Sequence, residues 1–375
     1  MTAETAPGTP DSGYPLGWES VGEVQSRIGG RGLARWGVHQ ARALAEANRG
    51  KMAPKGRPAR VMVDGVGLAY HEHGQGRPLV LVHGLAACSA SWHETASLLS
   101  RDFRCIAVDL MGFGHSDKPV GESYTLERQA ELLQLFLVEL ALEDAVLIGH
   151  SYGGGVCLSA LRDPCPRVSA LVLVDSICYP QPAPIPFRLL GFPVLGPLAL
   201  YLVPKSWVAG AVFGNAYGDR TAPAPELVAA NALALASASG RHALIQTVRA
   251  LVARPIEPLA NYSRLSLPTL IIWGRRDRLV PIALGQQLAS EIPGVKLAAF
   301  DTCGHLPQEE SPRETAEVIA RFVGEMPSGP TGSYGRPCHG GDHQQCAQSS
   351  PRSATFSILG ASQNRGVSDC REQHV

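Results

Sequence analysis

One serine stands among glycines in the stretch Gly-His-Ser-Tyr-Gly-Gly, residues 149–154. Ser151 has Gly149 two residues before it and Gly153 two residues after it, and the apolar run 145–148 leads directly into the stretch. Small residues at these positions allow a sharp turn between a strand and a helix, and such a turn exposes the serine hydroxyl above a sheet. The pattern therefore predicts that Ser151 is a nucleophile.

A serine hydroxyl is a poor nucleophile at neutral pH unless a base removes its proton, and the base needs an acid that fixes its tautomer and stabilises its charge. Asp277 follows the apolar run 269–274, and His305 follows the run 295–301. The chain order serine, aspartate, histidine is the one expected when the nucleophile lies on a strand-to-helix turn. We therefore predict that Asp277 and His305 serve the nucleophile. Asp175, at the end of a third apolar run, is the alternative acid.

Attack on a carbonyl also needs N–H donors for the oxygen that becomes negatively charged. The backbone amide of Tyr152 directly follows the nucleophile, and that of Leu85 lies in the turn after the apolar run 78–82. These two amides are the predicted oxyanion hole. His83 is predicted to be structural, because one imidazole base is sufficient.

Short apolar runs must hold these residues in place, and they alternate with helix-length stretches. The runs are residues 78–84, 104–110, 145–150, 170–175, 269–274 and 295–301. Continuous apolar runs of this length are typical of strands that are buried on both faces of a parallel sheet. The alternation predicts an α/β fold, with a mostly parallel central sheet flanked by helices.

The alternation is interrupted at residues 178–262, which carry many prolines and several apolar helical stretches but no convincing strand. We expect this segment to be an inserted helical cap over the carboxyl edge of the sheet. Residues 176–218 carry only two charged side chains, Arg188 and Lys205, so a strongly anionic substrate is not indicated. The predicted substrate contacts are Trp92, Phe187, Phe192 and Trp207.

Five motifs occur in an order that resembles the α/β-hydrolase superfamily, over about residues 60–325. They are HGLAACSASW (83–92), DLMGFGHSDKP (109–119), GHSYGG (149–154), WGRRDRLVP (273–281) and GHLPQEESP (304–312). The resemblance implies that Ser151 is the nucleophile, Asp277 the acid and His305 the base. It also implies that the residues from Asp109 to Ser116 form a structural turn. The serine argues against the haloalkane dehalogenases and epoxide hydrolases of this superfamily, which carry an aspartate nucleophile.

From these residues we predict a serine hydrolase that cleaves an ester of an apolar carboxylic acid or alcohol through an acyl-enzyme intermediate, without a metal or an organic cofactor. One alternative is a hydrolase of carbon–carbon bonds in ring-fission products, although such enzymes usually have a glycine-richer oxyanion turn than HGLAACSASW. The other alternative is a non-catalytic small-molecule receptor on the same fold. The intact set of serine, aspartate and histidine favours an enzyme.

Composition limits the partners and the compartment. The 33 Lys and Arg residues balance the 33 Asp and Glu residues, so no overall positive charge predicts nucleic-acid binding. The nine cysteines have no regular spacing and predict reduced thiols in the cytoplasm. The start of the chain lacks a secretory signal pattern, and the longest uncharged apolar run, within residues 189–204, is too short and too rich in proline to span a membrane.

Two terminal segments flank the predicted hydrolase domain, residues 59–326. Residues 1–58 are predicted to be a basic arm that is partly helical or disordered. We expect this arm to pack loosely on the body. The alternative is a weak contact of the arm, or of the cap, with a membrane surface. Residues 327–375 are poor in large apolar side chains and predict a disordered tail. The tail's cysteines and histidines are irregularly spaced, so no metal site is predicted from Cys338, His339, His343 and Cys346.

Overall fold

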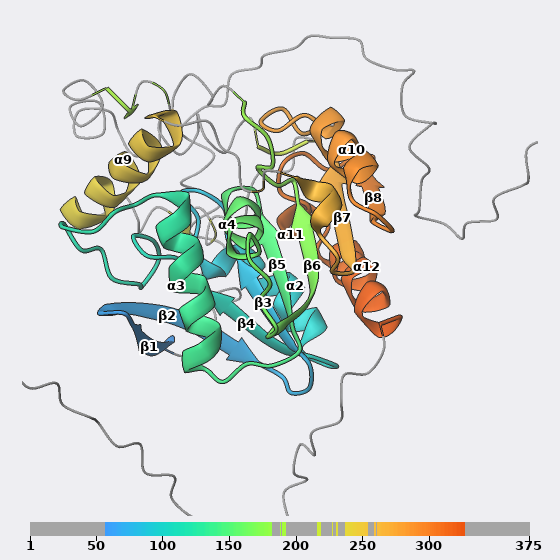
Figure 1. Cartoon of the computed structure of the whole chain (residues 1–375), viewed down its shortest axis with the longest axis horizontal. Helices are drawn as coiled ribbons and strands as arrows, with labels where there is room; N and C mark the ends of the chain where they lie inside the picture. Colours follow the sequence, from blue (N-terminus) through green and yellow to red (C-terminus); the bar gives the residue numbers. More distant parts are fainter. Residues whose placement is uncertain are drawn as a thin grey trace, which may run out of the picture. The chain divides into compact units, whose positions relative to one another are not determined.

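An eight-stranded sheet forms the centre of the described chain (Figure 1). The computed structural model describes residues 57–181, 188, 190–192, 216–218, 227, 230–231, 237–253, 259 and 261–326. The strands are β1 (Ala59–Val63), β2 (Val66–His73), β3 (Pro78–Val82), β4 (Arg104–Val108), β5 (Ala145–His150), β6 (Val168–Val174), β7 (Thr269–Gly274) and β8 (Lys296–Phe300). Their order across the sheet is β1-β2-β4-β3-β5-β6-β7-β8. Strands β4, β3, β5, β6, β7 and β8 pair in parallel, which confirms the predicted mostly parallel sheet.

The antiparallel edge of the sheet was not predicted from the sequence. Strand β1 pairs with β2, and β2 pairs with β4, both antiparallel. Asp64 and Gly65 form the two-residue turn between β1 and β2, and both have positive φ angles, of 46° and 77°. An Asp-Gly pair between apolar residues is a strong hairpin signal, because this tight turn requires positive φ at both positions.

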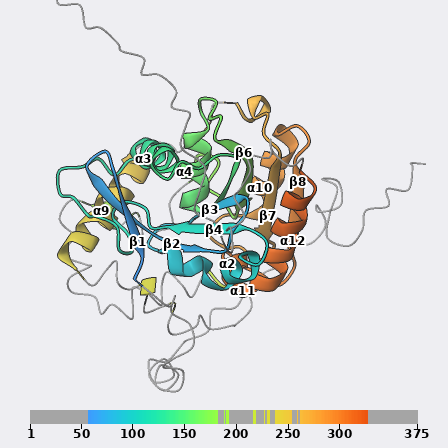
Figure 2. The ribbon, with the colours of Figure 1, turned by 90° about the horizontal axis from the view of Figure 1, so that it is seen from below.

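Helices cover both faces of the sheet (Figures 1 and 2). Helices α3 (Leu126–Glu139), α4 (Tyr152–Ala160) and α10 (Ile282–Glu291) share one core cluster with one face of the sheet. Helices α2 (His93–Leu99) and α12 (Pro312–Gly324) share a second cluster with the opposite face. Side chains of β3 alternate between the two clusters, Val80 in the first and Leu81 in the second, as expected for a strand buried on both sides.

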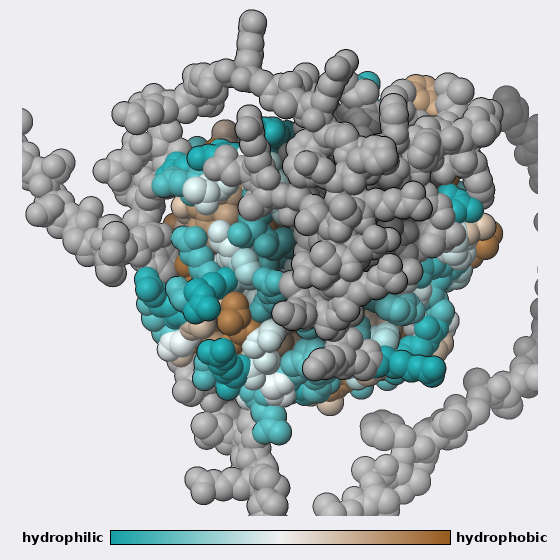
Figure 3. Space-filling view, turned by 180° about the vertical axis from the view of Figure 1, so that it is seen from behind, coloured by the Kyte–Doolittle hydropathy of each residue, from teal (hydrophilic) through white to brown (hydrophobic). Residues whose placement is uncertain are grey.

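Shorter elements complete the body: the 3₁₀ helices η1 (Ser89–Trp92) and η2 (Tyr262–Arg264), and helix α11 (Pro307–Glu310). Within the predicted cap, helix α9 (Ala238–Ala253) packs through Ala243, Leu244 and Val248 into the first core cluster. In the view from behind, the described side chains are mostly hydrophilic, with hydrophobic ones scattered among them (Figure 3). None of the described helices is both long and apolar enough to cross a membrane.

Several predictions concern residues that lie outside the described ones. They include nearly all of the basic arm, the tail with its cysteines and histidines, and most of the cap segment 178–262. The boundaries of the arm, the cap and the tail therefore stay predictions.

Candidate active site

A sharp turn carries Ser151 from the end of β5 into α4. Ser151 has φ 51° and ψ −116°, a backbone conformation that costs a side chain-bearing residue about 1–3 kcal/mol. A Cβ atom on Gly149 would lie 2.6 Å from the Gly154 Cα, and one on Gly153 would lie 2.4 Å from the His83 carbonyl oxygen. Both glycines are therefore required for the turn, and the strand, turn and helix are the ones that the sequence predicts.

The predicted nucleophile, acid and base, Ser151, Asp277 and His305, meet at the carboxyl ends of β5, β7 and β8. The Ser151 Oγ lies 2.9 Å from the His305 Nε2, and the His305 Nδ1 lies 2.7 Å from the Asp277 Oδ2. Both distances fit a nucleophile, a base and an orienting acid in one hydrogen-bonded chain. The exposed fractions are small, 6% for Ser151, 6% for His305 and 8% for Asp277, so the chain of hydrogen bonds is shielded from bulk water.

Backbone groups hold the acid in one orientation. The Asp277 Oδ1 accepts hydrogen bonds from the N–H groups of Leu279, at 2.7 Å, and Val280, at 2.9 Å. The Asp277 Oδ2 is thereby directed at His305. Burial alone would raise the pKa of Asp277, but His305 and the backbone donors outweigh it and the pKa is lowered. Asp277 is therefore charged at neutral pH.

Asp175, the alternative acid, lies at the end of β6 beside Asp277. It is fully buried, and its Oδ1 accepts the N–H of Gly274 at 3.0 Å. Burial, and then the charge of Asp277, raise the pKa of Asp175 well above its usual range. The raised pKa of Asp175 and the lowered pKa of Asp277 favour one negative charge on the pair, carried by Asp277. Asp277, and not Asp175, hydrogen-bonds His305.

The donor types of Asp175, Asp277 and His305 are also those of a metal site, with ligand atoms within 4.8 Å of one another. However, the His305 Nδ1 and the Asp277 Oδ2 are already joined by a hydrogen bond. A metal ion would have to break that bond to use both atoms. The arrangement fits proton transfer better than metal binding.

The predicted oxyanion turn lies against the nucleophile. A Cβ atom on Gly84 would lie 3.3 Å from the Ser151 Cβ. The next residue, Leu85, and the first residue of α4, Tyr152, have backbone N–H groups that make no hydrogen bond to another described residue. Among the described residues, nothing competes for these two N–H groups, and their role as an oxyanion hole stays a prediction.

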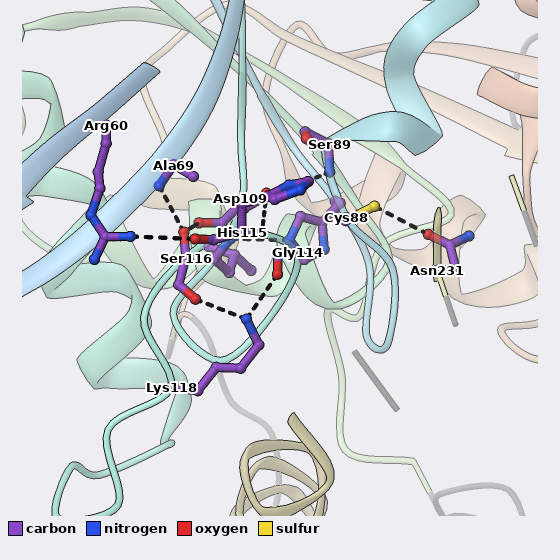
Figure 4. A network of polar contacts seen from close by, with 12 residues as sticks. Arg60, Ala69, Cys88, Ser89, Asp109, Gly114, His115, Ser116, Lys118 and Asn231 are labelled. Atoms are coloured by element: carbon purple, nitrogen blue, oxygen red, sulfur yellow. Dashed lines mark hydrogen bonds and ion pairs between the residues drawn. The ribbon is translucent and has the colours of Figure 1, made fainter. Parts of the chain in front are cut away.

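A buried carboxylate holds this turn in place (Figure 4). The Asp109 Oδ1 accepts the Ser89 N–H at 2.7 Å, and the Oδ2 accepts the His115 N–H at 2.8 Å. Burial opposes ionisation of Asp109, but these bonds and the neighbouring histidines lower its pKa to about 2. Asp109 therefore ties the segment after the oxyanion turn to the DLMGFGHSDKP segment, the structural role that the resemblance implies.

His83 has a structural environment. Its Nε2 lies 3.0 Å from the Leu110 N–H, which can only donate, so the ring proton is on Nδ1. That proton is directed at the Gly84 carbonyl oxygen, 2.8 Å away. Burial lowers the pKa of His83, so the ring is neutral and fully engaged.

The four predicted substrate-contact residues have different positions in the structure. Trp92 has no exposed surface and packs in the second core cluster with Leu79 and Leu81, because η1 turns its ring toward the sheet. The prediction that Trp92 contacts the substrate is therefore wrong. Phe192 is 52% exposed. Phe187 and Trp207 lie outside the described residues.

Sequence reasoning missed the surroundings of His305 within the cap and after β8. Glu310 accepts the N–H groups of Gly218 and of Gly304, the residue before His305, and the Tyr217 hydroxyl donates to Glu309. Glu309 and Glu310 lie in the GHLPQEESP motif, in which the sequence predicts a role only for His305. Tyr217 follows no periodic pattern, so the sequence offers no signal for its position.

Comparisons with known proteins identify the family of the fold. A family model described as "alpha/beta hydrolase fold" matches residues 77–312. The chain is 31% identical over 271 residues to an uncharacterized hydrolase of Bacillus subtilis, covering 70% of this chain and 97% of that protein. It is 30% identical over 268 residues to a 2-hydroxymuconate semialdehyde hydrolase of Pseudomonas putida, covering 68% of this chain and 90% of that protein. The crystal structure of an alpha/beta hydrolase fold protein from Burkholderia ambifaria superposes with a TM-score of 0.61 and 28% identity, covering 70% of this chain and 97% of that one. The chain therefore belongs to the α/β-hydrolase family.

Proposed function

We propose that the protein is a serine hydrolase that cleaves an ester of an apolar acid or alcohol through an acyl-enzyme. The observation that carries this proposal is the continuous hydrogen-bonded chain from the Ser151 Oγ through His305 to Asp277. A receptor that only binds a ligand has no need for a strained serine beside a buried, oriented imidazole.

In the proposed reaction, the Ser151 Oγ attacks the ester carbonyl carbon while the His305 Nε2 accepts the hydroxyl proton. The carbonyl oxygen becomes an oxyanion that accepts hydrogen bonds from the N–H groups of Leu85 and Tyr152. The tetrahedral intermediate collapses, the bond to the alcohol oxygen breaks, and His305 donates its proton to that oxygen. Water then attacks the acyl-enzyme with His305 again as the base, which releases the acid and restores Ser151.

Asp277 stabilises the imidazolium that forms in each half of this reaction, and it keeps the lone pair of the Nε2 directed at Ser151. The low exposure of the three residues supports this role, because a charge pair that is shielded from water interacts more strongly. No metal or organic cofactor takes part in the proposed steps.

The apolar character of the substrate is proposed from the cap sequence. Between Ser176 and Gly218 the chain carries only Arg188 and Lys205 as charged residues. An apolar pocket contributes about 0.8 kcal/mol for each methylene group that it buries, which is a rate gain of up to about fourfold per carbon. Ester specificity therefore ought to rise with acyl chain length until the pocket is filled.

One relative favours a second candidate, the hydrolysis of a carbon–carbon bond in a dienoic ketone. The Pseudomonas putida protein that is 30% identical to this chain is named a 2-hydroxymuconate semialdehyde hydrolase. The same three residues can serve that reaction. Its substrate carries a carboxylate, however, and the first part of the cap, within residues 176–218, carries only Arg188 and Lys205 as cations that could bind one.

One substrate screen separates the two candidates. Purified protein and its Ser151→Ala variant are assayed with p-nitrophenyl esters from acetate to long acyl chains, and with a carboxylate-bearing dienoic ketone. We expect kcat/KM to rise several-fold from acetate to a chain of about six to eight carbons, and to disappear in the variant. A preference for acetate would refute the apolar pocket. Faster turnover of the dienoic ketone than of every ester would establish the second candidate instead.

A further inference from the structure

A short piece of the insertion, Ala216–Gly218, is bonded to the loop that carries His305. The backbone N–H of His305 donates to the Ala216 carbonyl oxygen at 2.5 Å. The Gly218 N–H donates to the Glu310 Oε2 at 2.8 Å, and the Glu310 Oε1 accepts the Gly304 N–H at 2.8 Å. One carboxylate thus joins the two segments immediately beside the histidine.

The two backbones touch without room for a side chain. A Cβ atom on Gly218 would lie 2.4 Å from the Gly304 nitrogen, and one on Gly304 would lie 2.3 Å from the Ala216 carbonyl oxygen. Such contacts are shorter than any that real Cβ atoms make. The position of the His305 backbone therefore depends on where Ala216–Gly218 lies.

The opposite side of His305 is held by the nucleophile strand. The His150 Nε2 lies 2.7 Å from the His305 carbonyl oxygen, which can only accept, so His150 donates. Burial is the main cause that lowers the pKa of His150 to about 3, so the ring is neutral. Both backbone groups of His305 are thus bonded, one to the residue before Ser151 and the other to the insertion.

Tyr217 extends this contact to the acid. It is buried and forms an apolar cluster with Leu306, the neighbour of His305, and with Leu279. Leu279 donates its N–H to Asp277. One side chain of the insertion therefore packs with the loops of both residues that serve Ser151.

A hydrogen bond fixes the far end of the Tyr217 ring. Its hydroxyl donates to the Glu309 Oε2, while the Glu309 Oε1 accepts the Ser91 hydroxyl at 2.5 Å. Ser91 belongs to η1 in the body, so Glu309 links the insertion to the body. The two hydrogen bonds to the Glu309 carboxylate can be removed separately, one from Tyr217 and one from Ser91. Only the bond from Tyr217 involves the insertion, so loss of the Ser91 bond is the control.

We propose that Tyr217 is a positioning residue: through it, the segment Ala216–Gly218 holds His305 and Asp277 in the geometry that Ser151 needs. This inference rests on the proposed hydrolase function. It assigns the insertion a part in the chemical step in addition to its expected part in substrate choice. Removing the Tyr217 hydroxyl then lowers kcat by the same factor for short and long acyl chains, whereas loss of a pocket contact raises KM most for the long ones.

The test compares Tyr217→Phe with Ser91→Ala, using acetate and hexanoate p-nitrophenyl esters. Tyr217→Phe keeps the ring and its apolar packing. We expect it to lower kcat about tenfold for both esters, with KM changed less than about twofold, because small displacements of a reacting group are costly. Ser91→Ala removes the other bond of Glu309 and is expected to leave kcat within about twofold. The melting temperature of each variant checks that the fold is kept.

A second variant covers the case in which other bonds compensate for the lost hydroxyl. Gly218→Ala forces the two backbones apart and is expected to lower kcat more than Tyr217→Phe does. Unchanged kcat in both variants, or a rise in KM confined to hexanoate, would overturn the inference. Labelling of the wild type by a fluorophosphonate is measured first. Its absence would overturn the proposed function and this inference together, whereas a labelled wild type with unaffected variants overturns the inference alone.

Discussion

Replacing Asp277 by asparagine tests the proton-transfer chain with a change of one atom. The Asp277 Oδ1 accepts two backbone N–H groups, so the oxygen of the new amide must stay there. Its NH₂ group then faces the His305 Nδ1, at the position where the Oδ2 now lies 2.7 Å away. The Nδ1 has to accept that hydrogen bond, and the ring proton moves to the Nε2, which faces Ser151. His305 in this tautomer cannot remove the serine proton.

The expected loss follows from that tautomer. Asparagine in place of an orienting aspartate lowers kcat by about 10⁴-fold in a well-studied serine hydrolase with the same arrangement, which corresponds to about 5 kcal/mol of activation free energy. We expect a loss of similar size here with little change in KM, because Asp277 lies behind His305 and not beside the substrate. Steady-state kinetics with hexanoate ester gives both constants.

Asp175→Asn is the matched control, since it makes the same atomic change on the neighbouring strand end. Asp175 accepts one backbone N–H, and its raised pKa favours the neutral form beside Asp277. An asparagine amide keeps the acceptor and supplies a donor for Asp277. We therefore expect kcat to change by less than about threefold, the effect of a slightly altered hydrogen bond. The reasoning fails if Asp175→Asn is the more damaging variant, because the acid would then lie on β6.

The remaining predictions concern stability. Deleting residues 327–375 is expected to leave the melting temperature and ester turnover unchanged, because this segment has too few large apolar side chains to form a core. Its large aliphatic and Phe side chains are only Phe356, Ile358, Leu359, Val367 and Val375. A loss of several degrees on deletion, or a melting temperature of the full chain that depends on zinc, would contradict this. Burial raises the pKa of Glu309 from 4.5 to about 7, so the folded state binds this proton more tightly than the unfolded state. The free energy of unfolding should then fall as the pH rises from about 4.5 to 7, by at most about 3 kcal/mol from this group. Glu309→Gln should remove this pH-dependent fall in the free energy of unfolding. Urea unfolding is therefore expected to show the variant more stable than the wild type at about pH 8 but not at about pH 4.5. Equal stability of the two proteins at both pH values would refute the raised pKa of Glu309.

The sequence predicts the sheet and the hydrogen-bonded residues well, because both depend on local signals. Apolar runs mark the six parallel strands, and Ser151, Asp277 and His305 follow directly after three of them. The carboxyl ends of parallel strands meet at one edge, so residues placed there come together without further information. The Asp64-Gly65 turn between β1 and β2 has an equally local signal, an Asp-Gly pair between apolar residues.

Other features depend on packing that no local pattern records. Trp92 follows the oxyanion turn, where an aromatic residue could face either the pocket or the core, and the 3₁₀ turn η1 decides for the core. Tyr217 lies far before His305 in the chain and meets its loop only through the path of the insertion. The raised pKa of Asp175 depends on its burial beside Asp277, and this proximity appears only when β6 and β7 pair.

The central claim is that the Ser151 hydroxyl is activated by His305, and fluorophosphonate labelling tests it most directly. Wild-type protein is treated with the reagent, digested and analysed by mass spectrometry, beside Ser151→Ala protein whose circular dichroism spectrum matches the wild type. We predict one adduct per chain, on the peptide that contains Ser151, and none on the variant. An adduct that persists in Ser151→Ala, or a folded wild type that takes up no reagent, would contradict the claim.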